Sequence, residues 1–229
     1  MNILDHGYVR LVNVMGSDVD IVNAARASFE KEVSELSEKD INLIDFLVKD
    51  KHDSCFRHCT LTFEIYAPLM VARQWYKHSV ASTHLDDQMG WNESSRRYIT
   101  ENEQFYIPDV DMWRGAATNR KQGSSGYVDI DMGRKYTQRM RDMVRTYHQM
   151  YLEALDDGLA PEQARMLLPA YSLYVRWRWT ASLNAVLNFI SLRTGHGAQS
   201  EIQEYANAIL HYTQGYFPHT IESWKRHRI

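Results

Sequence analysis

The chain has 229 residues, of which 44 % are hydrophobic and 24 % are charged, and its formal net charge is −3. This length is sufficient for a sizeable core, and the composition is that of an ordinary globular protein. The small negative charge argues against general affinity for nucleic acids, and no apolar run approaches the ~20 residues of a membrane helix. The pattern of a signal peptide is absent from the first residues, MNILDHGYVRLV, so we expect a cytoplasmic protein with no nucleic-acid or membrane partner.

Helical spacing of apolar residues predicts two helices near the N-terminus, over residues 18–28 and 38–49. The second helix is preceded by Ser37, and Asp40 lies three residues later. This pair resembles the capping arrangement that begins many helices, although the strict form has Glu or Gln in the later position.

A strand followed by a helix is predicted next. Residues 60–66 alternate in polarity as a half-buried strand, with one face formed by Leu61, Phe63 and Ile65. Pro68 then allows a helix to begin, over residues 69–78. The end of this helix is expected to present three polar side chains together: Arg73, Gln74 and Lys77.

The middle of the chain contains irregular segments and one long helix. We expect a short strand at residues 105–108 and a loop at residues 113–127, which is rich in Gly, Ser and charge. A long amphipathic helix is predicted from about Asp129 to Asp157, ended by Gly158. Its apolar stripe, interpreted as core packing, consists of Tyr136, Met140, Met143, Tyr147 and Tyr151.

The C-terminal part continues the mixture of helices and strands. A helix is predicted within residues 161–169, a strand at residues 171–179, and two helices at residues 183–193 and 198–218. The sequence therefore predicts an α+β fold in which helices dominate. It contains neither the Gly-rich dinucleotide fingerprint nor the P-loop sequence, so a nucleotide would have to be held in another way.

The two cysteines, Cys55 and Cys59, lie four positions apart on either side of His58. A second Cys pair, which a disulfide framework or a tetrahedral metal site needs, is absent. We interpret both residues as buried free thiols and expect no metal site; a reactive thiol would need a more electropositive setting than Arg57 and His58 provide.

Residues 73–98, RQWYKHSVASTHLDDQMGWNESSRRY, carry the densest group of cations, hydroxyls and amides in the chain. Such residues are costly to bury unless they are paired, so packing alone does not account for the group. Guanidinium groups beside hydroxyls suit a phosphate or a nucleotide. Arg165 and Arg193, each at the end of an apolar run, would be ordinary helix-end cations if judged alone.

This segment resembles the signature of the flavin-dependent thymidylate synthases: Arg-His-Arg, a spacer to Ser, then Asn-Glu-x-Ser-x-Arg-Tyr. The resemblance extends to most of the chain, because four further regions match in the right order. These are LVNVMGSDVDIVNAARASF, KHDSCFRHCTLTFEIYAPLMVARQW, GLAPEQARMLLP and WTASLNAVLNFISLRTGHGAQSEIQ.

The resemblance implies one domain over residues 1–229, with helices packed on a small antiparallel sheet, and a homotetramer. It implies FAD as cofactor, with NADPH and methylenetetrahydrofolate as co-substrates, and reductive methylation of dUMP to dTMP without a protein nucleophile. The flavin would carry the redox chemistry while the protein binds, orients and polarises.

The family's site residues transfer to matching positions. Arg193 would contact the pyrimidine and favour its ionised, nucleophilic form, as the catalytic residue. The other dUMP contacts implied are Gln74, Lys77, Glu93, Ser94, Ser95, Arg96, Arg97 and Arg165. The flavin contacts implied are Ser28, His52, Ser54, Lys77, His78, Ser79, Glu93, Ser182, Asn184 and Asn188.

The chain departs from the family pattern at several positions. Arg-His-Arg is replaced by Lys77-His78-Ser79, so both flanking guanidiniums are lost, and Lys supplies a point charge without a bidentate fork. The spacer between Ser82 and Asn92 is longer than the family's, and the expected Ser-His-Ala-Gln is shifted by one residue. We interpret the chain as a phage-like branch of the family.

Three alternatives stay open on the sequence. The same fold could methylate or hydroxymethylate dCMP, because the donors of Arg193 could also serve a cytosine oxygen. A chain that has lost its flavin through the change at residues 77–79 would be a non-redox nucleotide-binding protein. A metal phosphohydrolase built on His52, Asp53 and His58 would need further ligands at suitable spacing.

Overall fold

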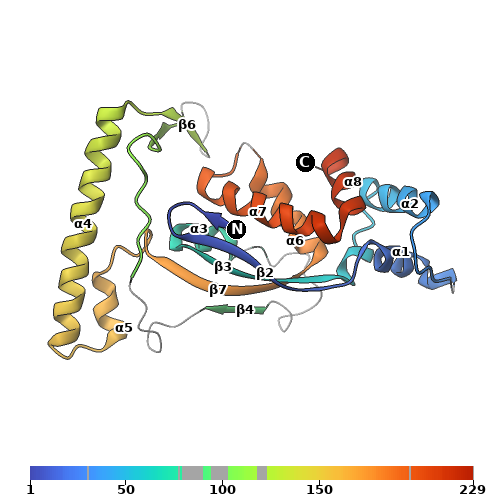
Figure 1. Cartoon of the computed structure of the whole chain (residues 1–229), viewed down its shortest axis with the longest axis horizontal. Coiled ribbons are helices and arrows are strands. Elements are labelled where there is room, and N and C mark those ends of the chain that lie inside the picture. Colours follow the sequence, from blue (N-terminus) through green and yellow to red (C-terminus); the bar gives the residue numbers. More distant parts are fainter. Residues whose placement is uncertain are drawn as a thin grey trace.

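The computed structural model describes residues 1–29, 31–76, 78, 90–93, 103–117, 123–195 and 197–228, with only the backbone of Ser28, Gly90 and Trp91. Its centre is an antiparallel sheet of five strands in the order β1-β2-β3-β7-β4 (Figure 1). These strands are β1 (Asn2–Ile3), β2 (Gly7–Met15), β3 (Thr60–Pro68), β4 (Gly90–Glu93) and β7 (Tyr174–Ser182). A separate hairpin is formed by β5 (Arg114–Ala116) and β6 (Ser124–Tyr127).

Helices cover one face of the sheet and both of its ends. Figure 1 shows α3, α6 and α7 over one face, α1, α2 and α8 at one end, and α4 with α5 at the other. Their bounds are α1 Asp18–Arg26, α2 Glu38–Lys49, α3 Leu69–Trp75, α4 Ile130–Asp156, α5 Pro161–Ala164, α6 Leu183–Thr194, α7 Ser200–Tyr216 and α8 Pro218–Arg228. Short 3₁₀ turns occur at Ala27–Phe29, Cys55–Arg57 and Arg165–Leu167. The predicted α+β class is confirmed.

The core lies between the sheet and the helices that cover it. Leu61, Phe63 and Ile65 of β3 are fully buried, as predicted, while the intervening residues are half-buried. Phe63 is paired with Trp179 of β7, and opposite residues in an antiparallel pair share one face of the sheet. The Trp179 ring packs in turn against Trp75 of α3, with ring centroids 5.5 Å apart.

Elements with a regular pattern were predicted correctly. The predicted helix at 38–49 is α2, and Asp40 accepts hydrogen bonds from the backbone N–H of Ser37 at 2.8 Å and from its hydroxyl at 2.6 Å. The predicted strand at 60–66 is β3, and the long helix is α4. The predicted strand at 171–179 begins later, at Tyr174, because the residues before it form a turn.

Two predictions about less regular segments were wrong, and several elements, among them β2, β4 and α8, were not predicted. Residues 105–108 form only an isolated bridge, from Phe105 to Leu173. The expected loop at 113–127 contains β5 and β6. The alternation in β2 is broken by a register shift between Leu11 and Asn13, which hides the strand from a period-two search. Helix α8 was not predicted either.

Helix α8 begins on a carboxylate supplied by a distant helix. Asp18 of α1 accepts the backbone N–H groups of His219 at 2.8 Å and Thr220 at 3.2 Å. The Thr220 hydroxyl donates to the same carboxylate at 2.5 Å. Backbone N–H groups in the first turn of a helix lack partners within it, so Asp18 provides a cap that no local sequence signal reveals.

The predicted stripe of α4 is correct in part. Tyr151 is buried and Met140 and Met143 are half-buried, but Tyr136 and Tyr147 are exposed. The other inward residues are Gly133, Thr137, Val144 and His148. Thr137 tolerates this position because its hydroxyl accepts from Trp113 Nε1 at 2.9 Å and donates to the Pro108 carbonyl at 2.8 Å. Paired polar groups can be buried, which a purely hydrophobic pattern does not anticipate.

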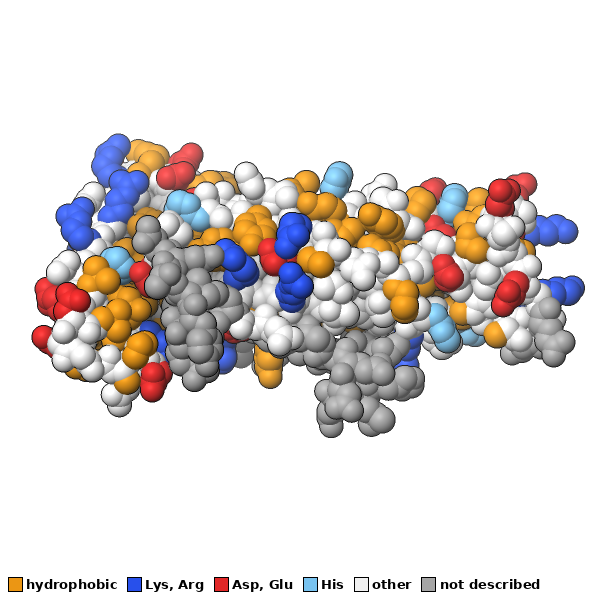
Figure 2. Space-filling view, turned by 60° about the horizontal axis from the view of Figure 1, so that its bottom comes forward, with side chains coloured by type: hydrophobic (Ala, Val, Ile, Leu, Met, Phe, Trp, Pro, Cys, Tyr) orange, Lys and Arg blue, Asp and Glu red, His pale blue; other side chains and the backbone are white. Residues whose placement is uncertain are grey.

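The surface carries apolar and charged side chains together. Hydrophobic side chains are exposed at the end formed by α4 and α5, beside groups of Lys and Arg (Figure 2). The apolar residues of α4 that remain exposed include Ile130, Met132, Tyr136, Tyr147, Met150 and Leu152. None of the helices in the described part of the chain is both long and apolar enough to span a bilayer.

Two helical glycines give a matched stability test. A Cβ at Gly133 would lie 1.7 Å from the Val110 carbonyl oxygen, whereas a Cβ at Gly215 would meet nothing within 4 Å. Alanine improves helix propensity at both positions by roughly 0.5–1 kcal/mol, but at Gly133 the clash must separate α4 from the backbone of Val110, costing about 1–3 kcal/mol. We expect Gly133→Ala to lower the thermal midpoint and Gly215→Ala to keep or raise it. Equal shifts would contradict this contact.

Candidate functional site

The C-terminal ends of α3 and α6 meet around the Arg193 side chain. Arg193 Nε donates to His78 Nε2 at 2.9 Å, and Arg193 Nη2 lies 3.5 Å from the backbone carbonyl oxygen of Gln74. Trp75 and Phe189 stack between the two helices, with ring centroids 4.3 Å apart. Two buried aromatic rings thus fix the helix crossing that brings three of the predicted site residues together.

The His78–Arg193 contact requires a neutral imidazole. A guanidinium has only donors, so His78 must accept through Nε2. Burial, with a smaller contribution from the Arg193 charge, lowers the pKa of His78 to about 4. Burial also lowers the pKa of Arg193, and among the described residues its two hydrogen bonds go to uncharged acceptors. Its positive charge is therefore oriented, and no carboxylate of the described residues neutralises it.

A second contact ties the Gln74 side chain to α7. Gln74 Nε2 donates to Gln199 Oε1 at 2.8 Å and to the Met70 carbonyl at 3.1 Å. Gln199 is the residue that precedes α7, and it was not among the predicted site residues. Gln199 could have been found from the sequence, because it is the last residue of the segment that resembles the family's Ser-His-Ala-Gln.

Glu93 and Arg165 come together at the far edge of the sheet. Glu93 is the last residue of β4 and is paired with Trp177 of β7, and Arg165 begins the 3₁₀ turn after α5. Both residues are exposed at the surface. Partial desolvation raises the pKa of the Glu93 carboxyl, and the charge of Arg165 opposes this rise. The two predicted nucleotide residues therefore interact electrostatically.

The first turns of α6 carry three predicted flavin residues. The Ser182 hydroxyl caps the helix by accepting the Ala185 backbone N–H at 3.3 Å. Asn184 is 2 % exposed, and its Nδ2 has no hydrogen-bond partner among the described residues. Asn188 lies one turn later, half-buried. A buried amide donor without an acceptor costs roughly 1–3 kcal/mol, and a ligand oxygen or ring nitrogen would remove this cost.

The remaining predicted flavin residues lie near α1 and α2. His52 is exposed, and its ring stacks on Phe46 at 5.4 Å. Ser54 precedes the 3₁₀ turn Cys55–Arg57, which packs against α6. Ser28 lies in the turn after α1. No hydrogen bond among the described residues joins these positions to Arg193.

Several predicted residues lie outside the part of the chain that is described. For the nucleotide these are Lys77, Ser94, Ser95, Arg96 and Arg97, and for the flavin they are Lys77 and Ser79. Of the shifted Ser-His-Ala-Gln region, His196 lies outside as well. The roles of all these residues stay predictions.

Both cysteines are free and buried, as predicted. Burial raises the pKa of Cys59 to about 12, with a smaller contribution from Asp20, and burial also raises the pKa of Cys55. A thiolate is the nucleophilic form of cysteine, so neither residue is prepared for attack at neutral pH. Within the described residues, no group of three or more His, Cys, Asp or Glu side chains could hold a metal ion.

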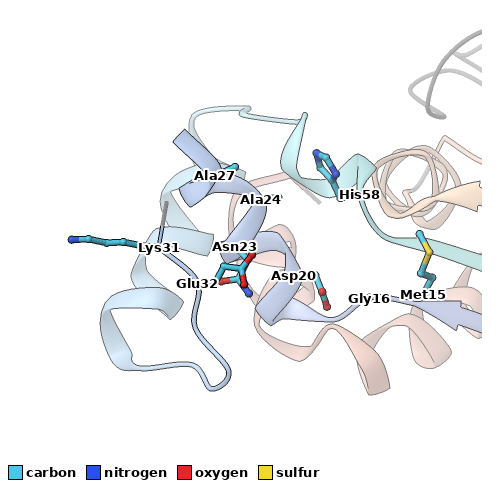
Figure 3. A pocket seen from close by; sticks show the side chains of 9 residues that line it. All are labelled: Met15, Gly16, Asp20, Asn23, Ala24, Ala27, Lys31, Glu32 and His58. Atoms are coloured by element: carbon cyan, nitrogen blue, oxygen red, sulfur yellow. The ribbon is translucent and has the colours of Figure 1, made fainter. Parts of the chain in front are cut away.

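One cavity adjoins α1, and another lies beside α3 and the β5–β6 hairpin. One, of about 840 Å³, is lined by nine residues of β2, α1 and the adjoining loops, among them Asp20, Glu32 and His58 (Figure 3). Lys31, its only lysine, points away from the other labelled side chains. Two carboxylates make this cavity unfavourable for a phosphate at neutral pH. The other, of about 370 Å³, is lined by Trp113 and the Arg114–Glu201 ion pair, and it includes Gln199.

Comparison with known proteins identifies the family. A family model described as "Thymidylate synthase complementing protein" matches residues 10–219. The flavin-dependent thymidylate synthase of Thermotoga neapolitana is 37 % identical over 97 % of this chain and 92 % of its own length. The enzyme of the same name from Anaplasma marginale is 36 % identical over 95 % of this chain and 72 % of its own length.

A solved structure supports the same conclusion. The UMP/dUMP methylase PolB from Streptomyces cacaoi, bound with 5-Br dUMP, is 26 % identical, with a TM-score of 0.84 over 100 % of this chain and 99 % of that chain. The same methylase bound with 5-Br UMP gives a TM-score of 0.82. Since the family match spans nearly the whole sequence and curated relatives are more than a third identical to it over the aligned residues, the chain belongs to the flavin-dependent thymidylate synthase family.

Proposed function

We propose that the chain methylates dUMP at C5 to give dTMP, with methylenetetrahydrofolate as carbon donor and NADPH as reductant through FAD. The observation that carries this proposal is the Arg193 guanidinium, which is held by uncharged acceptors where α3 and α6 meet. Relatives named flavin-dependent thymidylate synthases and a structural neighbour named a UMP/dUMP methylase support the reaction. The proposal treats residues 1–229 as one catalytic domain.

In this proposal, Arg193 acts on the pyrimidine ring. A guanidinium has five N–H donors, and two of its nitrogens are used by His78 and Gln74. The remaining N–H groups would face a ring oxygen or nitrogen that gains negative charge as C5 becomes nucleophilic. In many enzymes, the largest contribution to the rate enhancement comes from fixed hydrogen-bond donors that face the developing charge in a site from which water is excluded.

The nucleotide phosphate and sugar are assigned to the cations at the edge of the sheet and to the residues that follow β4 in the sequence. Arg165 and Gln74 are the described members of this set, with Glu93 beside Arg165. The expected members outside the described residues are Lys77, Ser94, Ser95, Arg96 and Arg97. A guanidinium binds phosphate through a planar fork, so Arg165 and Arg97 suit that role better than Lys77.

The residues present on α6 fit a flavin. The buried, unpartnered Asn184 amide needs an acceptor, and an isoalloxazine ring or its chain supplies carbonyl, ring-nitrogen and phosphate acceptors. We assign the flavin to Ser28, His52, Ser54, Lys77, His78, Ser79, Glu93, Ser182, Asn184 and Asn188. When bound, the flavin would supply the hydride that no side chain of the protein can supply. Buried thiols agree with a reaction that uses no cysteine nucleophile.

We also propose that the chain forms a homotetramer, as the family resemblance implies. The exposed tyrosines Tyr136 and Tyr147 on α4 give this helix an apolar surface that a monomer leaves in water. Aromatic residues are enriched at protein interfaces, so α4 is the best-suited helix for a subunit contact.

The direct test is an anaerobic reaction of the purified protein. NADPH is expected to bleach the absorbance of a bound flavin, and addition of methylenetetrahydrofolate with dUMP is expected to restore it while dTMP appears. The nucleotide product is identified by mass, with dCMP and UMP tested in parallel reactions. UMP is included because the structural neighbour is named a methylase of both uridine nucleotides.

The outcomes separate the remaining candidates. Formation of dTMP supports the proposal. Reaction with dCMP alone would assign a cytosine-modifying activity to the chain. A hydroxymethyl product would show that the chain transfers a hydroxymethyl group instead of a methyl group. A protein that binds dUMP but neither contains nor takes up flavin would be a non-redox nucleotide-binding protein, and the proposal would be wrong.

Arg193→Ala is expected to leave the fold intact and reduce turnover with dUMP about 100-fold or more, because donors to the developing charge are lost. Exposed Arg145 on α4 gives a matched control, Arg145→Ala, which is expected to turn over normally. Initial rates under saturating co-substrates measure the effect, with thermal midpoints to check folding. Wild-type turnover in Arg193→Ala would exclude the assigned role.

Arg165→Ala is expected chiefly to weaken dUMP binding, because a charge-assisted contact to phosphate is worth roughly 1.5–3 kcal/mol, or about ten- to a hundred-fold in affinity. Titration calorimetry with dUMP measures the change, and deoxyuridine, which lacks the phosphate, serves as the ligand control. The role assigned to Arg165 requires that the variant lose affinity for dUMP but not for deoxyuridine. Unchanged dUMP affinity would contradict it.

A further inference from the structure

The position of His78 is fixed independently of any ligand. It follows the end of α3, and its backbone N–H donates to the Trp75 carbonyl at 2.8 Å. The residue is 6 % exposed, and its ring meets the Phe189 ring edge-on, with centroids 5.0 Å apart. Phe189 lies one helical turn before Arg193 on α6, so the same helix packs the imidazole and supplies its hydrogen-bond partner.

The hydrogen bond determines the chemical state of the ring. Because Arg193 Nε–H can only donate, His78 Nε2 carries the lone pair and the imidazole proton resides on Nδ1. A protonated ring would have no acceptor and would repel the guanidinium. The low pKa of His78, about 4, agrees with a neutral ring throughout the neutral range.

We propose that His78 is a positioning residue for Arg193, and that its neutral imidazole turns the guanidinium toward the pyrimidine of the bound nucleotide. This inference rests on the proposed function, and it goes beyond the flavin contact that the family resemblance assigns to His78. The second acceptor, the Gln74 carbonyl at 3.5 Å, is too distant to fix the guanidinium plane alone.

An imidazole suits this task better than the usual partner of an arginine. A carboxylate would orient the guanidinium equally well, but it would neutralise the charge that the ligand needs. The Arg114–Glu201 ion pair, with N···O at 2.5 Å, shows the other solution in the same chain, where a carboxylate neutralises a half-buried arginine. A neutral acceptor on Arg193 leaves its full charge for the developing anion.

The test compares two replacements of His78 in the flavin-loaded enzyme. His78→Phe keeps a ring against Phe189 but removes the acceptor, and His78→Gln keeps an acceptor oxygen at similar reach. The exposed His211 on α7 supplies the controls His211→Phe and His211→Gln. His78→Leu, which also lacks an acceptor, replaces the phenylalanine variant if that variant does not fold. Each protein is measured for bound flavin per chain, dUMP affinity by calorimetry, and turnover at saturating dUMP.

We expect His78→Phe to retain flavin, to bind dUMP about ten-fold more weakly, the size of one well-made hydrogen bond, and to lose turnover in addition. His78→Gln is expected to recover most of both, and the His211 variants to match the wild type. Wild-type affinity and turnover in His78→Phe would overturn the proposal. Equal defects in the Phe and Gln variants, with loss of flavin, would also overturn it and assign His78 to the cofactor alone.

The proposed function is tested separately by the wild type and by Arg193→Ala. If the wild type does not bind dUMP, the proposed function fails. A different result rejects only the positioning role of His78. In that result the wild type binds dUMP and Arg193→Ala weakens catalysis, but His78→Phe does not; the proposed function then stands.

Discussion

The candidate site depends on how one guanidinium is held. Arg193 is partly withdrawn from water and donates to His78 Nε2 and the Gln74 carbonyl, neither of which carries a charge. These contacts fix its direction without cancelling its field. The Arg114–Glu201 pair illustrates the alternative, in which a carboxylate satisfies the cation and leaves little for a ligand. An oriented, unneutralised cation in a low-dielectric setting is what a pyrimidine that gains negative charge requires.

The helices and strands that obey a simple period were predictable from the sequence. Residues 38–49 and 60–66 follow the helical and strand periods closely, and both elements are present. Where polar groups are buried with partners, the pattern misleads: Thr137 replaces a neighbouring tyrosine in the inward line of α4 because it pairs with Trp113 and Pro108. Long-range capping, as by Asp18 on α8, leaves no local trace at all.

The identities of many site residues could be predicted, but their partners could not. The sequence placed His78 and Arg193 in one functional set only through family resemblance, and it assigned them to different ligands. Their hydrogen bond spans 115 positions, and the Gln74–Gln199 bond spans 125. Such contacts are set by how Trp75 packs on Phe189 and thereby crosses α3 over α6, which is a property of the three-dimensional core.

Two buried groups, the Cys59 thiol and the Asn184 amide, both favour a reaction whose bond-forming electrons come from a bound group and not from a side chain. Burial raises the pKa of Cys59 to about 12, which favours the thiol over the nucleophilic thiolate at neutral pH. The buried Asn184 amide, in contrast, lacks an acceptor within the described residues, and a bound ligand would supply one. Buried thiols, together with an amide donor at the start of α6 and the Arg193 guanidinium at its end, suit a chain whose side chains bind and orient a reactive group and leave the bond-forming electrons to that group.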